Sequence, residues 1–206
     1  MVEHVVTDIA ALEALYGAPA PTSLDKVASQ MTPLYRKWIM ASRFCVVSTV
    51  GPEGTDGSPR GDEGPVVDEL DEKTLIMPDW RGNNRIDTLR NIVADGRISL
   101  MFMVPGSTNV VRVNGTSCVS LSPELIGRFE KDGHLPRSVI VISIAEIYVQ
   151  CARAIMRAEL WPQDADNLGL PRSGRLVAEQ RAGFDDEAYE AAWQDRAAET
   201  MWSDPK

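Results

Sequence analysis

Hydrophobic residues recur with two different spacings along this chain of 206 residues. Apolar positions three and four residues apart predict amphipathic helices, which we place at residues 8–16, 34–43, 83–94, 123–131 and 185–201. Alternating or β-branched runs bounded by turn residues predict strands instead, at residues 44–50, 58–61, 74–78, 97–104, 110–120 and 139–150. We therefore expect a mainly β protein with flanking helices (α+β).

The order of these elements favours an antiparallel sheet. Few helices lie between the six strands, which argues against a doubly wound parallel sheet, where helices alternate with strands. An antiparallel barrel would remove exposed strand edges by closing on itself. We divide the chain into a helical extension over residues 1–35, a barrel over 36–157, and a C-terminal arm and helix over 158–206. The last part is expected to pack on the barrel or on a dimer partner.

Composition excludes several classes of protein. The net charge of −9 and the pI near 4.8 argue against a nucleic-acid surface, which is usually basic. The longest apolar run, residues 139–144, is far shorter than the ~18 residues of a membrane helix. The N-terminus also lacks the basic and apolar regions of a signal peptide. We expect neither nucleic-acid nor membrane binding.

The cysteines and histidines point to a cytoplasmic protein without a metal. Three cysteines with no C-x-x-C pair indicate reduced thiols. Two histidines, His4 and His134, make a zinc site improbable. A Ser-His-Asp hydrolase has weak support, because Ser58 occupies the wrong place for a G-x-S-x-G motif.

The segment from Met77 to Arg85 carries the strongest candidate chemistry. It joins a strand to the helix predicted at 83–94, so Gly82, Asn83 and Asn84 would form the first helical turn, with Arg81 and Arg85 on either side. Free backbone N–H groups, the positive end of the helix dipole and two guanidinium groups would then surround one point, which suits a phosphate monoester. An ordinary turn capped by Asn explains the same residues. This segment by itself does not distinguish a phosphate site from an ordinary capped turn.

Two further segments add polar groups. Ser58-Pro59-Arg60 follows a glycine-rich loop and offers a hydroxyl and a cation. In the strand at 110–120, Arg112 and Asn114 alternate with valines and so face away from them. A hairpin end and a solvated face are the alternative interpretations. Taken together, the three segments concentrate anion-binding groups in an otherwise acidic chain.

These motifs resemble the pyridoxamine 5′-phosphate oxidase-like flavoproteins. The residues that carry the likeness are Ser-Pro-Arg, Met-Pro-Asp-Trp-Arg-Gly-Asn-Asn, Ile-Ser-Leu-Met-Phe and Val-Arg-Val-Asn-Gly, within roughly residues 38–161. The tail Cys-Ala-Arg-Ala-Ile-Met-Arg with Leu-Trp is similar to a bacterial branch of FMN-dependent members. The resemblance implies a six-stranded split β-barrel that forms a homodimer, with FMN in the cleft between subunits.

The sequence also departs from the oxidase proper. Where the oxidase has an Arg-Lys pair that binds the flavin phosphate, this chain has Asn83 and Asn84, followed by Arg85. The C-terminal Arg-x-His substrate motif is absent, since no histidine follows His134. We therefore do not expect oxidation of pyridoxamine phosphate, although FMN binding is still implied.

The resemblance and the three segments together assign a set of cofactor-binding residues. Arg60 and Arg153 are candidates for the cation near the flavin N1 and C2 carbonyl, and Trp80 either covers the ring or packs in the core. Catalytic residues are not assigned. The full set is Ser58, Pro59, Arg60, Met77, Pro78, Asp79, Trp80, Arg81, Gly82, Asn83, Asn84, Arg85, Arg112, Asn114 and Arg153.

The expected function is that of an FMN-dependent oxidoreductase acting on an unknown small molecule. A non-catalytic flavin-binding or flavin-storage protein is the alternative, because a fold does not fix a function. A split barrel that uses a deazaflavin or haem is a third interpretation.

Overall fold

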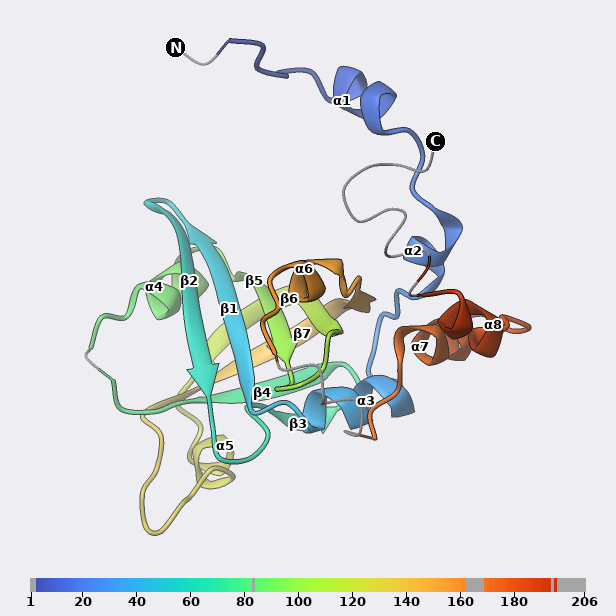
Figure 1. The fold of residues 1–206 in the computed structure, drawn as a ribbon. Helices are drawn as coiled ribbons and strands as arrows, with labels where there is room; N and C mark the ends of the chain where they lie inside the picture. The colour runs from blue at the N-terminus through green and yellow to red at the C-terminus, as the bar shows by residue number, and fades with distance from the viewer. Residues whose placement is uncertain (1–2, 83, 162–168, 194, 196–206) are drawn as a thin grey trace.

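A computed structural model describes residues 3–82, 84–161, 169–193 and 195, and its centre is one antiparallel sheet of seven strands (Figure 1). The strand order is β2-β1-β5-β6-β7-β4-β3. The strands are β1 (Phe44–Gly51), β2 (Gly54–Gly61), β3 (Asp68–Asp71), β4 (Thr74–Asp79), β5 (Arg97–Met103), β6 (Val110–Ser120) and β7 (Ser138–Gln150).

Short helices surround the sheet in the described part of the chain. They are α1 (Ile9–Tyr16), α2 (Pro21–Asp25), α3 (Pro33–Met40), α4 (Asp87–Ala94), α5 (Pro123–Gly127), α6 (Arg153–Arg157), α7 (Ser173–Gln180) and α8 (Asp186–Ala191). Helix α1 buries none of its residues and stands apart from the sheet in Figure 1. Helices α7 and α8 pack against each other, and α7 also contacts α2, α3 and β7.

The mainly β class is confirmed, but the expected closed six-stranded barrel is wrong in two respects. The sheet has seven strands, because residues 68–71 form β3 and pair with β4 at one edge. This acidic Asp-Glu-Leu-Asp segment has none of the β-branched residues that indicate a strand. The sheet is also open, since β2 and β3 are its two edges and do not pair with each other.

Several helices are shorter in the structure than predicted: the helix expected at 34–43 ends at Met40, and the helix expected at 83–94 begins at Asp87. The helix expected at 123–131 ends at Gly127. The helix expected at 185–201 appears as α8 over Asp186–Ala191, and most of its predicted C-terminal half lies outside the described residues. The pattern did not predict α2, α6 or α7.

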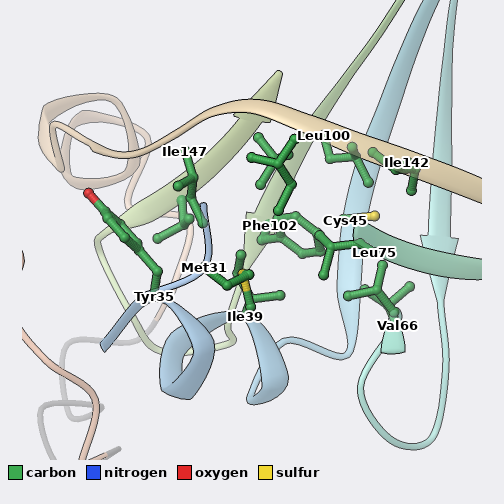
Figure 2. Packing of buried hydrophobic residues seen from close by; sticks show 14 of the residues in the cluster. Met31, Tyr35, Ile39, Cys45, Val66, Leu75, Leu100, Phe102, Ile142 and Ile147 are labelled. Atoms are coloured by element: carbon green, nitrogen blue, oxygen red, sulfur yellow. The ribbon is translucent and has the colours of Figure 1, made fainter. Parts of the chain in front are cut away.

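The core lies on the inner face of the curved sheet. Paired residues on neighbouring strands share a face, and one such row joins Cys45, Phe102, Val111 and Val149, all of which are buried. Figure 2 shows Phe102, Leu100 and Ile147 of the sheet facing Met31 and the α3 residues Tyr35 and Ile39. Helix α3 thus closes one end of the inner face.

Gly115 marks an irregularity between β6 and β7. The register shifts between Asn114 and Gly115, and a Cβ atom on Gly115 would lie 1.9 Å from the carbonyl oxygen of Ser143. Only glycine fits this close approach of two backbones. The shift keeps Ile142 and Ile140 on the inner face, opposite Leu75 and Met77 of β4.

Candidate functional site

Arg60 and Asp79 bring the two sides of the open sheet together. Arg60 pairs with Cys45 in the β-ladder, and Asp79 pairs with the buried Ser138. The Arg60 Nη1 atom lies 2.9 Å from Asp79 Oδ1, and both side chains are mostly shielded from solvent. A side-chain ion pair therefore bridges β2 and β4, where backbone hydrogen bonds are missing.

Ser58 lies between two residues of β2 that contact the ends of the loop from Trp80 to Ile86. Alternation places Asp56, Ser58 and Arg60 on the same face of β2. Arg60 reaches Asp79 just before this loop, and Asp56 accepts a hydrogen bond from Thr88 just after it. Arg60 thus lies beside the start of the 80–86 loop, and Ser58 shares its face of β2.

The expected helix start at Gly82, Asn83 and Asn84 is wrong. Helix α4 begins at Asp87, and its N-cap Ile86 makes no side-chain capping bond. Asn84 has a φ angle of +64°, which lies in the left-handed region and cannot belong to the first turn of a right-handed helix. Asn83 lies outside the described residues. Any anion at this loop would meet loop backbone and side chains rather than a helix terminus.

The arginines of the 80–86 loop are exposed. Arg85 forms an ion pair with Asp87 at 2.6 Å and is 80% exposed, and Arg81 is exposed as well. Arg137 donates from Nη1 to Asn84 Oδ1 at 2.6 Å. Arg137 was not among the predicted site residues, because it lies 53 residues away from Asn84 with no motif around it.

Trp80 is held by a charged pair. Its Nε1 donates to Asp62 Oδ2 at 3.1 Å, and the Lys131 Nζ lies 5.8 Å from the ring centroid and also bonds Asp62. Burial would raise the pKa of Asp62, but hydrogen bonds from Lys131 and Trp80 outweigh it and lower that pKa. The bond to Asp62 in turn raises the pKa of Lys131. Trp80 is thereby fixed beside the 80–86 loop, half-buried rather than in the core.

Met77 and Pro78 are buried, with Met77 in the core cluster. Pro59 is exposed on the opposite face of β2 from Arg60.

Arg112 and Asn114 lie on the outer face of the sheet, as the alternation predicted. Arg112 Nη2 donates to Ser99 Oγ at 3.3 Å, and its guanidinium group lies 5.6 Å from the Tyr148 ring centroid. Asn114 Nδ2 donates to Glu146 Oε1 at 2.7 Å. Because Arg60 faces inward, the structure does not bring Arg112 and Asn114 together with it within one chain.

Arg153 lies neither beside Arg60 and the 80–86 loop nor on the outer face with Arg112 and Asn114. It is the first residue of α6, just beyond the end of β7, and its backbone N–H donates to Cys151 Sγ at 3.4 Å. It lines a hollow near α2 and α7, described below.

Several buried polar atoms have no hydrogen-bond partner within the described part of the chain. Among the site residues they are Arg60 Nε, Arg112 Nε and Asn114 Oδ1. Buried polar groups in folded proteins are nearly always paired. On each face of the sheet these atoms thus lack the hydrogen bond that a buried polar group normally makes.

The described residues include no cluster of three or more His, Cys, Asp or Glu side chains that could hold a metal ion. None of the described helices has both the length and the apolar character needed to span a bilayer.

A family model described as pyridoxamine 5′-phosphate oxidase matches residues 31–151, more than half of the chain. The chain belongs to this family. The match covers Ser58, Arg60, the 80–86 loop, Arg112 and Asn114, and it ends before Arg153.

Solved structures in the comparison are distant in sequence. The HupZ protein of Group A Streptococcus is 19% identical, with a TM-score of 0.49, and the match covers 58% of this chain and 93% of that one. General Stress Protein 26 of Bacillus anthracis is 15% identical, with a TM-score of 0.44, covering 55% and 88%. An FMN-binding protein of Syntrophomonas wolfei is 15% identical, with a TM-score of 0.42, covering 57% and 82%. A comparison with curated proteins gave no match.

Proposed function

We propose that this protein binds FMN, with the phosphate between Ser58, Arg60 and the 80–86 loop. The observation that carries the proposal is the convergence of β2 and this loop at the open side of the sheet, where Arg60 Nε is buried without a partner in the described chain. Membership of the pyridoxamine 5′-phosphate oxidase family supports the same ligand.

The groups present fit a phosphate. Asp79 holds one end of the Arg60 guanidinium group and so fixes its orientation, while Nε keeps its hydrogen available. Ser58 can donate a hydroxyl hydrogen, and the exposed Arg81 adds positive charge. Charge-assisted hydrogen bonds of this kind contribute about 1.5–3 kcal/mol each. The carboxylates of Asp79 and Asp87 offset part of the positive charge, so we expect hydrogen bonding to matter more here than net charge.

We propose that the flavin ring lies against the outer sheet face of a second copy. Arg112 and Asn114 face away from Arg60 in the same chain, so one flavin can meet both groups only at a contact between two chains. Arg112 would present a donor and Asn114 an acceptor to the polar edge of the ring. The protein is thus proposed to be a homodimer with FMN at the subunit interface.

We propose further that the protein is an FMN-dependent oxidoreductase acting on a small molecule in the cytoplasm. Bound FMN would supply the electron-accepting ring, and the protein would position it and set its electrostatic surroundings. The free thiols Cys45, Cys118 and Cys151 suit a reducing compartment. The alternative is a flavin-binding or flavin-storage protein without a substrate of its own.

The absorbance spectrum of the purified protein tests the cofactor. We expect flavin bands near ~370 and ~450 nm, and release of FMN rather than FAD on denaturation, because no Rossmann G-x-G-x-x-G motif is present for a dinucleotide. A colourless protein that fails to bind added FMN would contradict the proposal. The spectrum of a haem or a deazaflavin would instead show that the protein binds that cofactor and not FMN.

Reduction by nicotinamide cofactors separates the two functional classes. An oxidoreductase should bleach its flavin with NADH or NADPH far faster than free FMN is bleached. A rate no higher than that of free FMN, with both donors, favours the binding protein.

A further inference from the structure

A hollow lies on the other side of the molecule from the 80–86 loop (Figure 1). It has a volume of about 200 Å³ and is formed by α2, the end of β7, α7 and α8. These three helices lie close together in Figure 1, and α7 contacts α2, α8 and β7. The space is larger than the ~30 Å³ that one water occupies in the liquid, so it has room for a small organic molecule.

Most of this wall lies outside the segment that matches the family. Only residues 149–151 of the lining fall within residues 31–151, and the rest precede or follow that segment. The hollow is therefore built by the extensions of this chain, and the family match assigns it no role.

Among the described residues, the charged side chains of this wall are cations, whereas the chain is acidic. Lys26 and Arg153 both line the hollow, whereas none of the described lining residues is Asp or Glu. The chain as a whole carries a net charge of −9. Within the described residues the Lys26 ammonium group forms no ion pair, and burial lowers its pKa. Lys26 is half-buried, and a partly desolvated cation without a carboxylate partner is favoured by an anion that reaches it.

Backbone contacts hold the wall in place. The Tyr35 hydroxyl donates to the carbonyl oxygen of Lys26 at 2.6 Å and accepts from the N–H of Val149 at 3.1 Å. Ala28 and Ile147 exchange two backbone hydrogen bonds. Lys26 and the end of β7 are thus fixed relative to each other before any ligand arrives, which favours a preformed site.

The remaining wall is mixed in polarity. Val149, Val177, Tyr189 and Trp193 supply apolar and aromatic surface. Gln150 also lines the hollow, and its Oε1 atom is buried without a hydrogen-bond partner in the described chain. Ligand sites commonly combine such apolar walls with a few fixed polar groups.

We propose that this hollow, which we name the Lys26 pocket, binds a small organic acid whose carboxylate meets Lys26 and Arg153 and whose apolar body packs on Tyr189 and Trp193. The pocket is separate from the proposed flavin site, because Ser58, Arg60 and the 80–86 loop take no part in its wall.

Cys151 supplies a reporter inside the pocket. Iodoacetate and iodoacetamide alkylate a thiol by the same displacement of iodide, but only iodoacetate is an anion. Cys118 is an exposed thiol on β6 and provides the internal reference. Cys45 is buried, and burial raises the pKa of its thiol to about 12, so it should stay unmodified.

We expect the iodoacetate-to-iodoacetamide rate ratio to be roughly five-fold higher at Cys151 than at Cys118, about the effect of one charge pair in water. Peptide mass spectrometry measures each thiol separately. The Lys26→Met variant should lower the ratio at Cys151 toward that at Cys118, since among the described wall residues only Arg153 then remains as a cation, and Lys26→Arg should retain it. Equal ratios at the two thiols of the unmodified protein would overturn the proposal.

Protection by a matched pair of ligands tests the organic acid directly. Millimolar benzoate should slow alkylation of Cys151 by iodoacetamide and leave Cys118 unaffected, whereas benzamide, its neutral analogue, should protect much less. Equal protection by the two compounds, or none by benzoate, would overturn anion recognition.

FMN binding by Lys26→Met separates this proposal from the flavin site. We expect its melting temperature and FMN affinity to match those of the unmodified protein. Loss of FMN binding in a folded variant would mean that the pocket belongs to the flavin site, which overturns a separate function.

Discussion

Arg60 is held at one end by Asp79 and keeps one donor free, which makes it the most informative single residue. We expect Arg60→Ala to weaken FMN binding about 10- to 100-fold, because one or two charge-assisted hydrogen bonds to the phosphate are lost. Riboflavin lacks the phosphate, so its weaker binding should hardly change. Fluorescence titration with both ligands measures the difference.

The matched control is Arg97→Ala. Arg97 also pairs with a carboxylate, Asp95, but its side chain is 69% exposed, and α4 separates the two from the 80–86 loop in sequence. FMN affinity should be unchanged in this variant. If Arg60→Ala keeps normal FMN affinity and a normal melting temperature, the phosphate binds elsewhere.

Asp62, which bonds Trp80 and Lys131 beside the 80–86 loop, gives a prediction for how stability depends on pH. Its pKa in the folded protein is lowered below the ordinary value of 3.8, so the folded state binds fewer protons than the unfolded chain. The Asp62 contacts therefore stabilise the protein above that value, and their contribution is lost as the pH falls through the lowered folded pKa. We expect Asp62→Asn to cost on the order of 1 kcal/mol at pH 7.

Urea unfolding at several pH values measures this contribution of Asp62 to the free energy of unfolding. The difference in the free energy of unfolding between the unmodified protein and Asp62→Asn should be constant from pH 7 to about pH 5. It should shrink as the pH falls below the ordinary carboxyl pKa. Glu63→Gln, an exposed neighbour, should show little change at any pH. A difference that persists unchanged at the acid end would contradict the assignment.

The sequence predicts the direction and contacts of some single residues but not of others. The opposite directions of Arg112 and Val113 follow from the two-residue period of a strand, and the structure confirms them. The left-handed backbone of Asn84 has no such pattern, since Asn also caps helices well. The contact of Arg137 with Asn84 depends on tertiary folding, which local sequence does not encode.

At the scale of elements, five of the six expected strands agree with the structure to within about a residue at each end. Their strong β-branched pattern explains this success. The exception is β2, which starts four residues before the expected Ser58 because its first half is rich in glycine and polar residues. Strand β3 was missed for a similar reason, since its pairing with β4 rather than its composition makes it a strand.

Gly115 provides a test of the β6–β7 irregularity. We expect Gly115→Ala to cost about 3 kcal/mol or more, because its Cβ would lie 1.9 Å from the Ser143 carbonyl oxygen and one strand must move. For a chain of this length that corresponds to a fall in melting temperature of roughly 6–12 °C. Gly57→Ala is the control, since a Cβ there meets nothing within 4 Å. Equal melting temperatures for the two variants would refute the close approach.

Helix α1 is expected to add little to stability. None of its residues is buried, although several are large and apolar, including Ile9 and Leu15. A chain that begins at Ala18 should therefore melt within a few degrees of the full chain when measured by circular dichroism at low concentration. A large loss of stability would mean that α1 packs on another surface in solution.

At the scale of the whole molecule, the strand pattern indicated an antiparallel sheet but could not settle its closure. Closure depends on whether β2 pairs with a strand on the other side of the sheet, and there β2 contacts β4 through the side chains of Arg60 and Asp79 rather than through backbone hydrogen bonds. The sequence located both residues and grouped them, yet it had no means of placing them on β2 and β4 at the open side of the sheet. The same limit explains why Arg112 and Arg153 were grouped with them.

The outer face of the sheet is where we expect the second chain to bind. One row on this face joins Pro59, Val46, Met101, Arg112 and Tyr148, and the middle of the row is apolar and partly exposed. Burying such a surface against a second copy would be favourable, at about 25 cal/mol per Å² of apolar area. It would also bring Arg112 and Asn114 to the flavin of the partner.

Met101→Glu should therefore disrupt the dimer and FMN binding together, because a charge would be buried at the centre of the interface. Light scattering at micromolar concentration should give the mass of two chains for the unmodified protein and of one chain for the variant. Val93→Glu, on the exposed side of α4, should change neither property, since Val93 is 79% exposed. If the unmodified protein has the mass of one chain and still binds FMN, the flavin is held within a single subunit and the interface proposal fails.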